Sequence, residues 1–252
     1  MTPAGLGRSS RRLTRASMFV FDAAAHVKAR LRPLADSAPS SLRRQGYLAF
    51  MAENMCAMHG IEVQLGGRVP RTPAILVANH ISYLDPLVIM SAVPTLAIAK
   101  HEVARWPVLG ELCRGLDMLL VDRSSPHSGA RVLLRARTLL ERGASILVFP
   151  EGTTTRGDDV LPFKRGVFGL ARRLGLPVVP IALDYLDEDV AWVDDMLLLP
   201  HYFKTSGQPR VGARLEFGAP MFAEPSERAE QFAARVRDRL CSQLRRDHAH
   251  AA

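Results

Sequence analysis

The sequence predicts an α/β fold in which a mostly parallel central sheet is flanked by helices, with an N-terminal extension of two amphipathic helices. From residue 61 onward, short apolar runs alternate with segments of helical periodicity, the pattern of parallel strands whose two faces are both covered. The chain has 252 residues, of which 48% are hydrophobic and 23% are charged, so it is long and apolar enough to bury a sizeable core.

The N-terminal extension begins with a predicted amphipathic helix over residues 11–32. Apolar residues recur there at spacings of three and four, while Arg12, Arg15, His26 and Arg30 lie off this stripe. The stripe consists of Leu13, Ala16, Val20, Ala24, Val27 and Leu31. Pro33 and the Ser/Pro-containing residues 36–41 end the helix in a turn, and a second helix is predicted over residues 42–59.

The basic charge is concentrated in this first part of the chain. The formal net charge is +8, and residues 1–70 hold ten Lys or Arg against four acids. A basic segment binds nucleic acid or an anionic membrane surface, and aromatic platforms for stacking bases are not evident. Since the chain has no run of eighteen apolar residues, we expect the first helix to lie flat in a lipid interface. The alternative is that both helices pack on each other and on the main domain.

The remaining elements alternate between strands and helices. Strands are predicted at residues 61–65, 73–79, 95–99, 118–121, 145–149 and 178–184, and helices at 86–92, 102–114, 128–142 and 164–174. Residues 211–217 alternate weakly and are predicted to form an edge strand, and a last helix is predicted over residues 224–246.

Polar residues able to do chemistry follow two of the predicted strands. His80 and Asp85 come after the strand at 73–79, and Glu151, Gly152 and Thr153 come after the strand at 145–149. Ligands of open α/β sheets bind beyond the carboxyl ends of the strands, so both groups should face one cleft. Asp85 can hold one imidazole nitrogen of His80 protonated while the other accepts a proton from an alcohol. In the alternative interpretation, Asp85 is an ordinary helix N-cap before Pro86.

Residues 151–157 and Arg123 suggest an anion site. The segment offers hydroxyl groups, backbone amides around two glycines, and Arg156, a combination suited to a phosphate or another anionic headgroup. Glu151 beside such a site should pair with Arg123, Arg156 or a substrate hydroxyl. The three cysteines form no CxxC pair, and the eight histidines are not spaced with them as zinc ligands, so no metal site is predicted.

Four segments resemble the motif blocks of the glycerolipid acyltransferase superfamily, in particular of the bacterial 1-acylglycerol-3-phosphate acyltransferases. They are Asn79-His80 through Asp85, Val121-Asp122-Arg123, Phe149-Pro150-Glu151-Gly152-Thr153 and Val179-Pro180-Ile181. The resemblance spans roughly residues 60–220. It implies transfer of a fatty acyl group from acyl-CoA or acyl carrier protein to a lysolipid hydroxyl, without an acyl-enzyme and with no cofactor beyond the acyl donor.

The resemblance also implies roles for individual residues. His80 would be the general base and Asp85 its orienting partner. The acceptor headgroup would be bound by Arg123, Glu151, Gly152, Thr153 and Arg156, and Pro180 would shape the acyl-donor side. Residues 1–60 would then form a membrane-binding extension and residues 61–252 the acyltransferase domain. We expect a peripheral protein at the cytoplasmic face of the inner membrane, with a membrane lipid as substrate and no nucleic acid partner.

Two departures from the family pattern concern the acceptor. Thr154 stands where many phosphatidate-forming members have arginine, and Asp117 replaces a glycine usual before the second block. Residues 190–201 are similar to a segment of relatives that acylate other lysolipids, including lyso-ornithine lipid. The expected acceptor is 1-acyl-sn-glycerol-3-phosphate, with lyso-ornithine lipid as the alternative. A hydrolase, which would need a metal or a nucleophilic serine, and a non-catalytic basic membrane-binding module are remoter alternatives.

Overall fold

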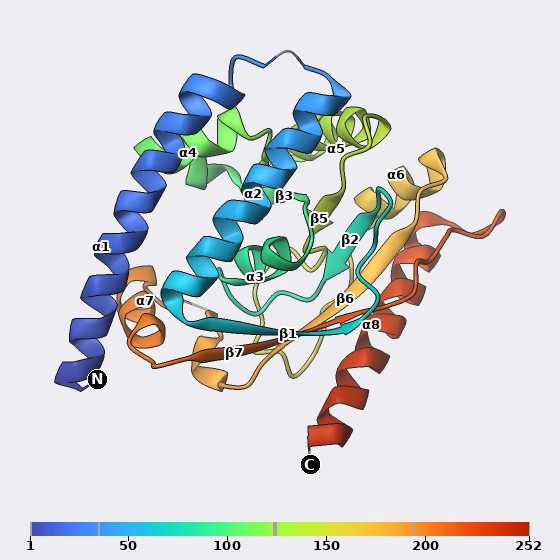
Figure 1. Cartoon of the computed structure of the whole chain (residues 1–252). Helices are drawn as coiled ribbons and strands as arrows, with labels where there is room; N and C mark the ends of the chain where they lie inside the picture. The colour runs from blue at the N-terminus through green and yellow to red at the C-terminus, as the bar shows by residue number, and fades with distance from the viewer. Residues whose placement is uncertain (1, 35, 123–124, 194, 252) are drawn as a thin grey trace.

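The computed structural model describes residues 2–34, 36–122, 125–193 and 195–251. Its centre is a seven-stranded sheet in the order β1-β7-β6-β2-β5-β3-β4 (Figure 1). The strands are β1 (Ile61–Gly67), β2 (Ile75–Ala78), β3 (Leu96–Lys100), β4 (Leu119–Val121), β5 (Ile146–Val148), β6 (Val178–Tyr185) and β7 (Val211–Phe217). β6 pairs antiparallel with β7, and every other neighbouring pair is parallel. The predicted mostly parallel α/β sheet is confirmed.

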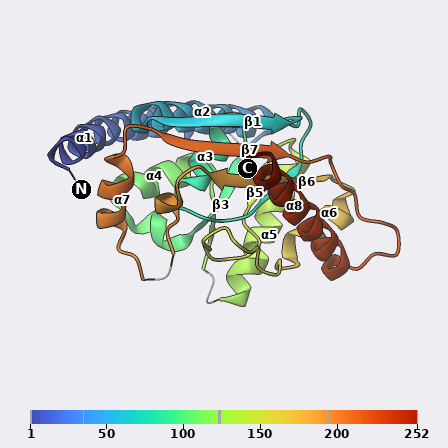
Figure 2. The same ribbon diagram turned by 90° about the horizontal axis from the view of Figure 1, so that it is seen from below.

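Helices cover both faces of the sheet. α1, α2 and β1 lie along one side of the molecule, and α5, α6 and α8 lie on the other (Figure 2). The helices are α1 (Pro3–His26), α2 (Ala38–His59), α3 (Asp85–Ala92), α4 (Pro107–Gly115), α5 (Pro126–Glu141), α6 (Gly166–Leu174), α7 (Leu198–Ser206) and α8 (Ala229–Ala251). Short helical turns are η1 (Val27–Leu31), η2 (His101–Arg105) and η3 (Glu188–Val190). The central strands β2 and β5 are buried along their whole length, as expected for strands covered on both faces.

Several predicted elements need correction. β7 lies between β1 and β6 and is not an edge strand; its inward residues are buried and its outward ones half-buried, which explains the weak alternation. The helix predicted over 102–114 is split into η2 and α4, because Pro107 cannot continue a helix from the preceding turn. α2 begins at Ala38, α8 begins at Ala229 and extends to Ala251, and α7 was not predicted.

The two N-terminal helices pack on the rest of the fold. Of the predicted stripe, Ala16, Val27 and Leu31 are buried and the other three residues are half-buried, and Val27 and Leu31 join the same hydrophobic core as the central strands. The stripe therefore faces the protein and not a lipid interface, because the sheet and helices offer it an apolar surface to cover. Among the described residues, no helix is long and apolar enough to cross a membrane.

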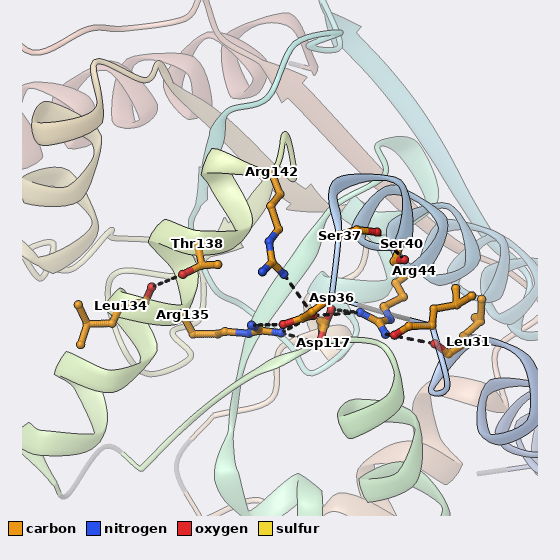
Figure 3. Close-up of polar contacts among 11 residues, drawn as sticks. Leu31, Asp36, Ser37, Ser40, Arg44, Asp117, Leu134, Arg135, Thr138 and Arg142 are labelled. Atoms are coloured by element: carbon orange, nitrogen blue, oxygen red, sulfur yellow. Dashed lines mark hydrogen bonds and ion pairs between the residues drawn. The ribbon is translucent and has the colours of Figure 1, made fainter.

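A network of ion pairs ties this N-terminal layer to α5 (Figure 3). Arg44 of α2 is buried, and its guanidinium lies 2.5 Å from Asp117 and 3.6 Å from Asp36. Arg135 of α5 bonds both aspartates at 3.0 Å, and Arg142 reaches Asp36 at 3.2 Å. Asp117 has φ 58, a conformation that glycine adopts without strain. The Asp117 carboxylate thus joins the turn before β4 to α2 and α5.

Candidate active site

His80 and Asp85 form a hydrogen-bonded pair beyond the end of β2. His80 Nδ1 lies 2.8 Å from Asp85 Oδ2, and the Asp85 side chain is fully buried while that of His80 is 13% exposed. An ionised carboxylate can only accept, so it fixes the imidazole tautomer with the proton on Nδ1. The other ring nitrogen, Nε2, is then the one that can take a proton from a substrate hydroxyl.

Asp85 is not the N-cap of α3. Its Oδ2 accepts the backbone N–H groups of Ile81 at 2.6 Å and Ser82 at 2.9 Å, which precede it in the chain. The residue at the cap position is Leu84, and no side chain caps the helix there. The carboxylate therefore closes the 80–85 turn and holds the imidazole, and the N-cap interpretation is wrong.

Tyr185 is a site residue that the sequence did not reveal. It is the last residue of β6, and its hydroxyl donates to Asp85 Oδ1 at 2.9 Å. Burial raises the pKa of Tyr185 well above its ordinary value, and the neighbouring Asp85 adds to the effect, so the phenol stays protonated and remains a donor. The rule that strand ends carry the site would have pointed to this hydroxyl, but the predicted strand stopped one residue short of it.

The loop after β5 is hydrogen-bonded to the backbone of His80. Glu151 accepts the N–H of His80 through Oε1 and the N–H of Leu161 through Oε2, both at 2.8 Å. Thr155 N–H donates to the His80 carbonyl at 2.8 Å. The two groups predicted to share a cleft are thus held together by hydrogen bonds.

Glu151 is held by backbone donors. Each of its carboxylate oxygens accepts one amide N–H, and its expected pairing with Arg123, Arg156 or a substrate hydroxyl stays a prediction. Burial is the largest influence and raises the pKa of Glu151, while the two amide bonds oppose that shift. The two bonds fix the loop to the His80 turn and satisfy a buried acid.

Phe149 and Asn79 set the position of the His80 ring. The imidazole stacks on Phe149, with ring centroids 4.1 Å apart and planes 20° from parallel. The Asn79 amide exchanges two hydrogen bonds of 2.8 Å with the backbone of Leu183 in β6. This side-chain bridge continues the β2–β6 pairing past the end of β2, so the turn carrying His80 starts from a fixed point.

An apolar pocket of about 340 Å³ lies next to this pair, between the sheet and helices α5 and α6. Its lining includes Ile98, Val121, Val132, Val148, Phe149 and Val167. Gly152 and Lys164 also line it, and a Cβ placed on Gly152 would lie 2.3 Å from Lys164 Nζ. The missing side chain of Gly152, at φ 81, thus leaves room for an ammonium group beside an apolar cavity.

The other residues predicted for the site are spread around this pocket. Thr153 and Arg156 are exposed on the loop that binds His80, while Arg123 lies outside the described residues. Pro180 is buried in β6. Its ring packs so closely on Gly218 that a Cβ added to this glycine would lie 2.7 Å from Pro180 Cγ. Pro180 does not line the pocket beside His80, so its observed contacts are those of a sheet residue.

Residues before α7 and in its first turn lie beside the His80 turn. The backbone N–H of Trp192 donates to the Ile81 carbonyl at 2.9 Å, and the Trp192 ring contacts Tyr83 edge-on. Tyr83 also contacts the buried His201 edge-on. Leu197 and Leu199 of this segment are strongly exposed. Trp192 and His201 therefore pack this part of the chain against the His80 turn.

Comparison with known proteins gives consistent results. A model of the acyltransferase family matches residues 60–184. The chain is 32% identical over 213 residues to a lyso-ornithine lipid O-acyltransferase of Pseudomonas aeruginosa, covering 82% of this chain and 81% of that protein. It is 31% identical over 180 residues to a 1-acyl-sn-glycerol-3-phosphate acyltransferase of Neisseria gonorrhoeae, covering 71% and 68%. The crystal structure of the acyltransferase PlsC from Thermotoga maritima has the same fold, with a TM-score of 0.73, 20% identity, and coverage of 97% and 96%.

The covered α/β sheet, with a histidine–carboxylate pair at its strand ends, is the architecture of an enzyme. The chain belongs to the acyltransferase family, and the resemblance seen in its motif blocks is confirmed. It is therefore an acyltransferase, and the hydrolase and the non-catalytic module are set aside.

Proposed function

We propose that this acyltransferase moves a fatty acyl group from a thioester donor, acyl-CoA or acyl carrier protein, to a hydroxyl group of a membrane lysolipid. The observation that carries the proposal is the His80–Asp85 pair, with the Nδ1 contact at 2.8 Å beside an apolar pocket. His80 Nε2 takes the hydroxyl proton as the oxygen bonds to the thioester carbonyl. The carbon–sulfur bond then breaks, and the leaving thiolate receives the proton from His80. Asp85 stays ionised and stabilises the imidazolium.

The pocket and Lys164 suit the two ends of an acylated substrate. Hydrocarbon is favoured against the valine and phenylalanine side chains that line the pocket, and a volume of about 340 Å³ falls in the range of small-molecule sites. The Lys164 ammonium beside Gly152 is placed to bind an anionic headgroup, together with Arg156 on the same loop and with Arg123. The negative headgroup and the hydroxyl would then approach His80 from the side of the 151–157 loop.

For the acceptor we propose 1-acyl-sn-glycerol-3-phosphate, which gives phosphatidic acid in phospholipid biosynthesis. A relative of that activity supports this choice. Lyso-ornithine lipid is the second candidate, because a relative named for that activity aligns over 82% of the chain and Trp192 packs on the His80 turn. Both acceptors offer a free hydroxyl and a charged headgroup, so the same pair of catalytic side chains serves either.

We further propose that the protein binds the anionic cytoplasmic face of the inner membrane peripherally, through the outer surface of α1 and α2. The side chains of Met18, Phe21 and Phe50 are 64%, 61% and 49% exposed there, and Arg11 and Arg15 are exposed on α1. Exposed apolar side chains among cations are typical of helices that lie in a lipid interface. These residues replace the buried stripe as the expected lipid contacts.

The test is acyl transfer by the purified protein. Wild type is incubated with labelled acyl-CoA or acyl carrier protein and a panel of lysolipids, and the diacyl product is separated from free fatty acid. His80→Ala should lower turnover by ~10²–10⁴-fold while the thermal midpoint stays near that of wild type, since the general base is lost and the ring is partly exposed. More than about a tenth of wild-type turnover in the variant, or release of free fatty acid by wild type without lysolipid product, would overturn the proposal.

A further inference from the structure

A broad groove runs over the outer surface of α5, α6 and the start of α8. Its volume is about 990 Å³, and its lining includes Ala130, Leu134 and Leu170. The Leu134 side chain is 65% exposed. Four arginines share the lining: Arg137, Arg172, Arg173 and Arg228. An exposed apolar centre with a charged rim is the composition of a protein-binding surface.

The groove carries a surplus of positive charge. Of its two glutamates, Glu224 and Glu230, the second pairs with Arg165 outside the groove. Arg172 donates to a backbone carbonyl, that of Glu227. Arg137 pairs with Glu141. Arg165 lowers the pKa of Glu230, and Arg228 helps to lower it. Among the described residues, no ion pair involves Arg173. The surface is therefore complementary to an acidic partner.

The groove adjoins the reaction centre. Leu133 and Gly166 line both the groove and the apolar pocket beside Phe149, on which His80 stacks. Gly129 of α5 lines the pocket as well, and a Cβ added to it would meet nothing within 4 Å. Leu133 and Gly166 thus lie at the boundary between the two spaces. A molecule held in the groove lies beside the apolar pocket next to His80.

The groove also lies away from the surface proposed to bind membrane. α5, α6 and α8 lie on the other side of the molecule from α1 and α2 (Figure 2). An enzyme bound to lipid through α1 and α2 would present the groove to the aqueous phase. Its occupant is therefore a soluble molecule, and the extent of the groove over three helices suits a folded surface.

From these observations we infer that the groove is the docking surface for a soluble, acidic acyl carrier protein, which presents the fatty acyl thioester to His80. The inference rests on the proposed acyl transfer and adds the place at which a protein donor binds. An acidic helix of the carrier would cover Leu134 and bring carboxylates against Arg173 and Arg228. Binding is then sensitive to salt, because the charges at the rim are solvated.

The experiment compares two charge reversals on exposed helical arginines of the full-length enzyme. Arg173→Glu lies in the groove, and Arg239→Glu on α8 lies outside its lining. Binding of fluorescently labelled acyl carrier protein is followed by anisotropy, and KM is measured with acyl carrier protein and with acyl-CoA as donor. Arg173→Glu should raise Kd and KM for the carrier protein by about fivefold or more, with the acyl-CoA KM and kcat unchanged. Arg239→Glu should leave all of them near wild type, and Leu134→Ser should act as Arg173→Glu does.

Five other outcomes would overturn the inference. A larger loss with acyl-CoA would assign the groove to the nucleotide of CoA, and equal losses with both donors would show that the groove does not recognise the carrier protein itself. Equal losses in both charge variants would show general electrostatic attraction. Weaker sedimentation of Arg173→Glu with anionic vesicles, at unchanged carrier binding, would assign the groove to lipid. Wild type that uses acyl-CoA but does not bind the carrier protein would refute the docking surface while the proposed function stands. If no donor supports transfer, the proposed function fails, and the anisotropy titration alone decides the docking surface.

Discussion

The carboxylate of Asp85 accepts four hydrogen bonds, and each has a separate consequence. Two come from the backbone of the 80–85 turn, one from His80 Nδ1 and one from the Tyr185 hydroxyl. The backbone bonds fix the turn, the imidazole bond fixes the tautomer, and the phenol bond anchors the carboxylate to β6. A charge buried this deeply persists because every bond to it is made.

We predict that Tyr185→Phe lowers kcat several-fold and leaves KM for both substrates unchanged, since Tyr185 touches Asp85 and acts on the substrate only through it. Losing the phenol donor removes the bond that anchors Asp85 Oδ1 to β6, so the carboxylate and the imidazole it orients are held less firmly. Steady-state kinetics with each substrate varied in turn measure kcat and KM, and thermal melting checks the fold. A variant that loses stability while kcat is unchanged would contradict the positioning role.

At the headgroup side, we predict that Lys164→Met raises KM for an anionic lysolipid about tenfold, because a charge-assisted contact to the headgroup is lost. The KM for the thioester donor should not change. The matched control is Lys204→Met, an exposed lysine of α7 that pairs with Asp189 and should leave both constants near wild type. Equal changes in both KM values would mean that Lys164 does not bind the headgroup.

At the scale of elements, the ion-pair network explains why the chain departs from its family pattern at Asp117. The position requires a left-handed backbone, for which glycine is the usual solution. Aspartate tolerates that backbone better than most residues, and here its two oxygens bind Arg44 and Arg135. Aspartate at position 117 lacks the backbone freedom of glycine. Its ion pairs instead link the turn before β4 to α2 and α5.

We predict that Asp117→Gly destabilises the fold by about 2–3 kcal/mol, because the buried Arg44 loses its closer carboxylate and keeps Asp36 at 3.6 Å. The thermal midpoint should fall by roughly 5–10 °C, measured by circular dichroism. Glycine removes the backbone strain at the same time, so a higher midpoint would show that strain outweighs the ion pairs. Asp36→Ala should have a smaller effect, because Asp36 is half exposed.

The same network makes stability depend on acidity. The hydrogen bond from Arg135 is the largest influence on Asp36, and it lowers the pKa of that carboxyl from 3.8 to about 2. A group with a lowered folded pKa stabilises the protein above its unfolded pKa. The contribution of Asp36 is therefore present at neutral pH and is lost as the pH falls from 3.8 to about 2.

For the whole molecule, we predict that Phe21→Asp weakens sedimentation with anionic vesicles about tenfold, because burial of one large apolar side chain in lipid is lost. The control is Phe222→Asp, which changes a similarly exposed phenylalanine outside α1 and α2. Turnover on a detergent-dispersed, short-chain lysolipid should be unchanged in both variants. Equal vesicle binding by Phe21→Asp and wild type would remove α1 from the membrane surface. Point variants suit this test because deleting α1 would also remove buried residues of the core.

The sequence by itself determined the α/β class, the order of the strands along the chain, and the motif blocks at the strand ends. These features are local: the period of apolar residues decides strand or helix, and the residues that follow a strand reach the carboxyl edge of the sheet. The tertiary structure alone decided which surface the α1 stripe covers, where β7 inserts, and what Asp85 and Glu151 bind. Tyr185 and Asp85 are 100 positions apart, and Glu151 and His80 are 71 apart. No period in the chain encodes such pairs, because they depend on how the strands are ordered in space and on how each buried charge finds its donors.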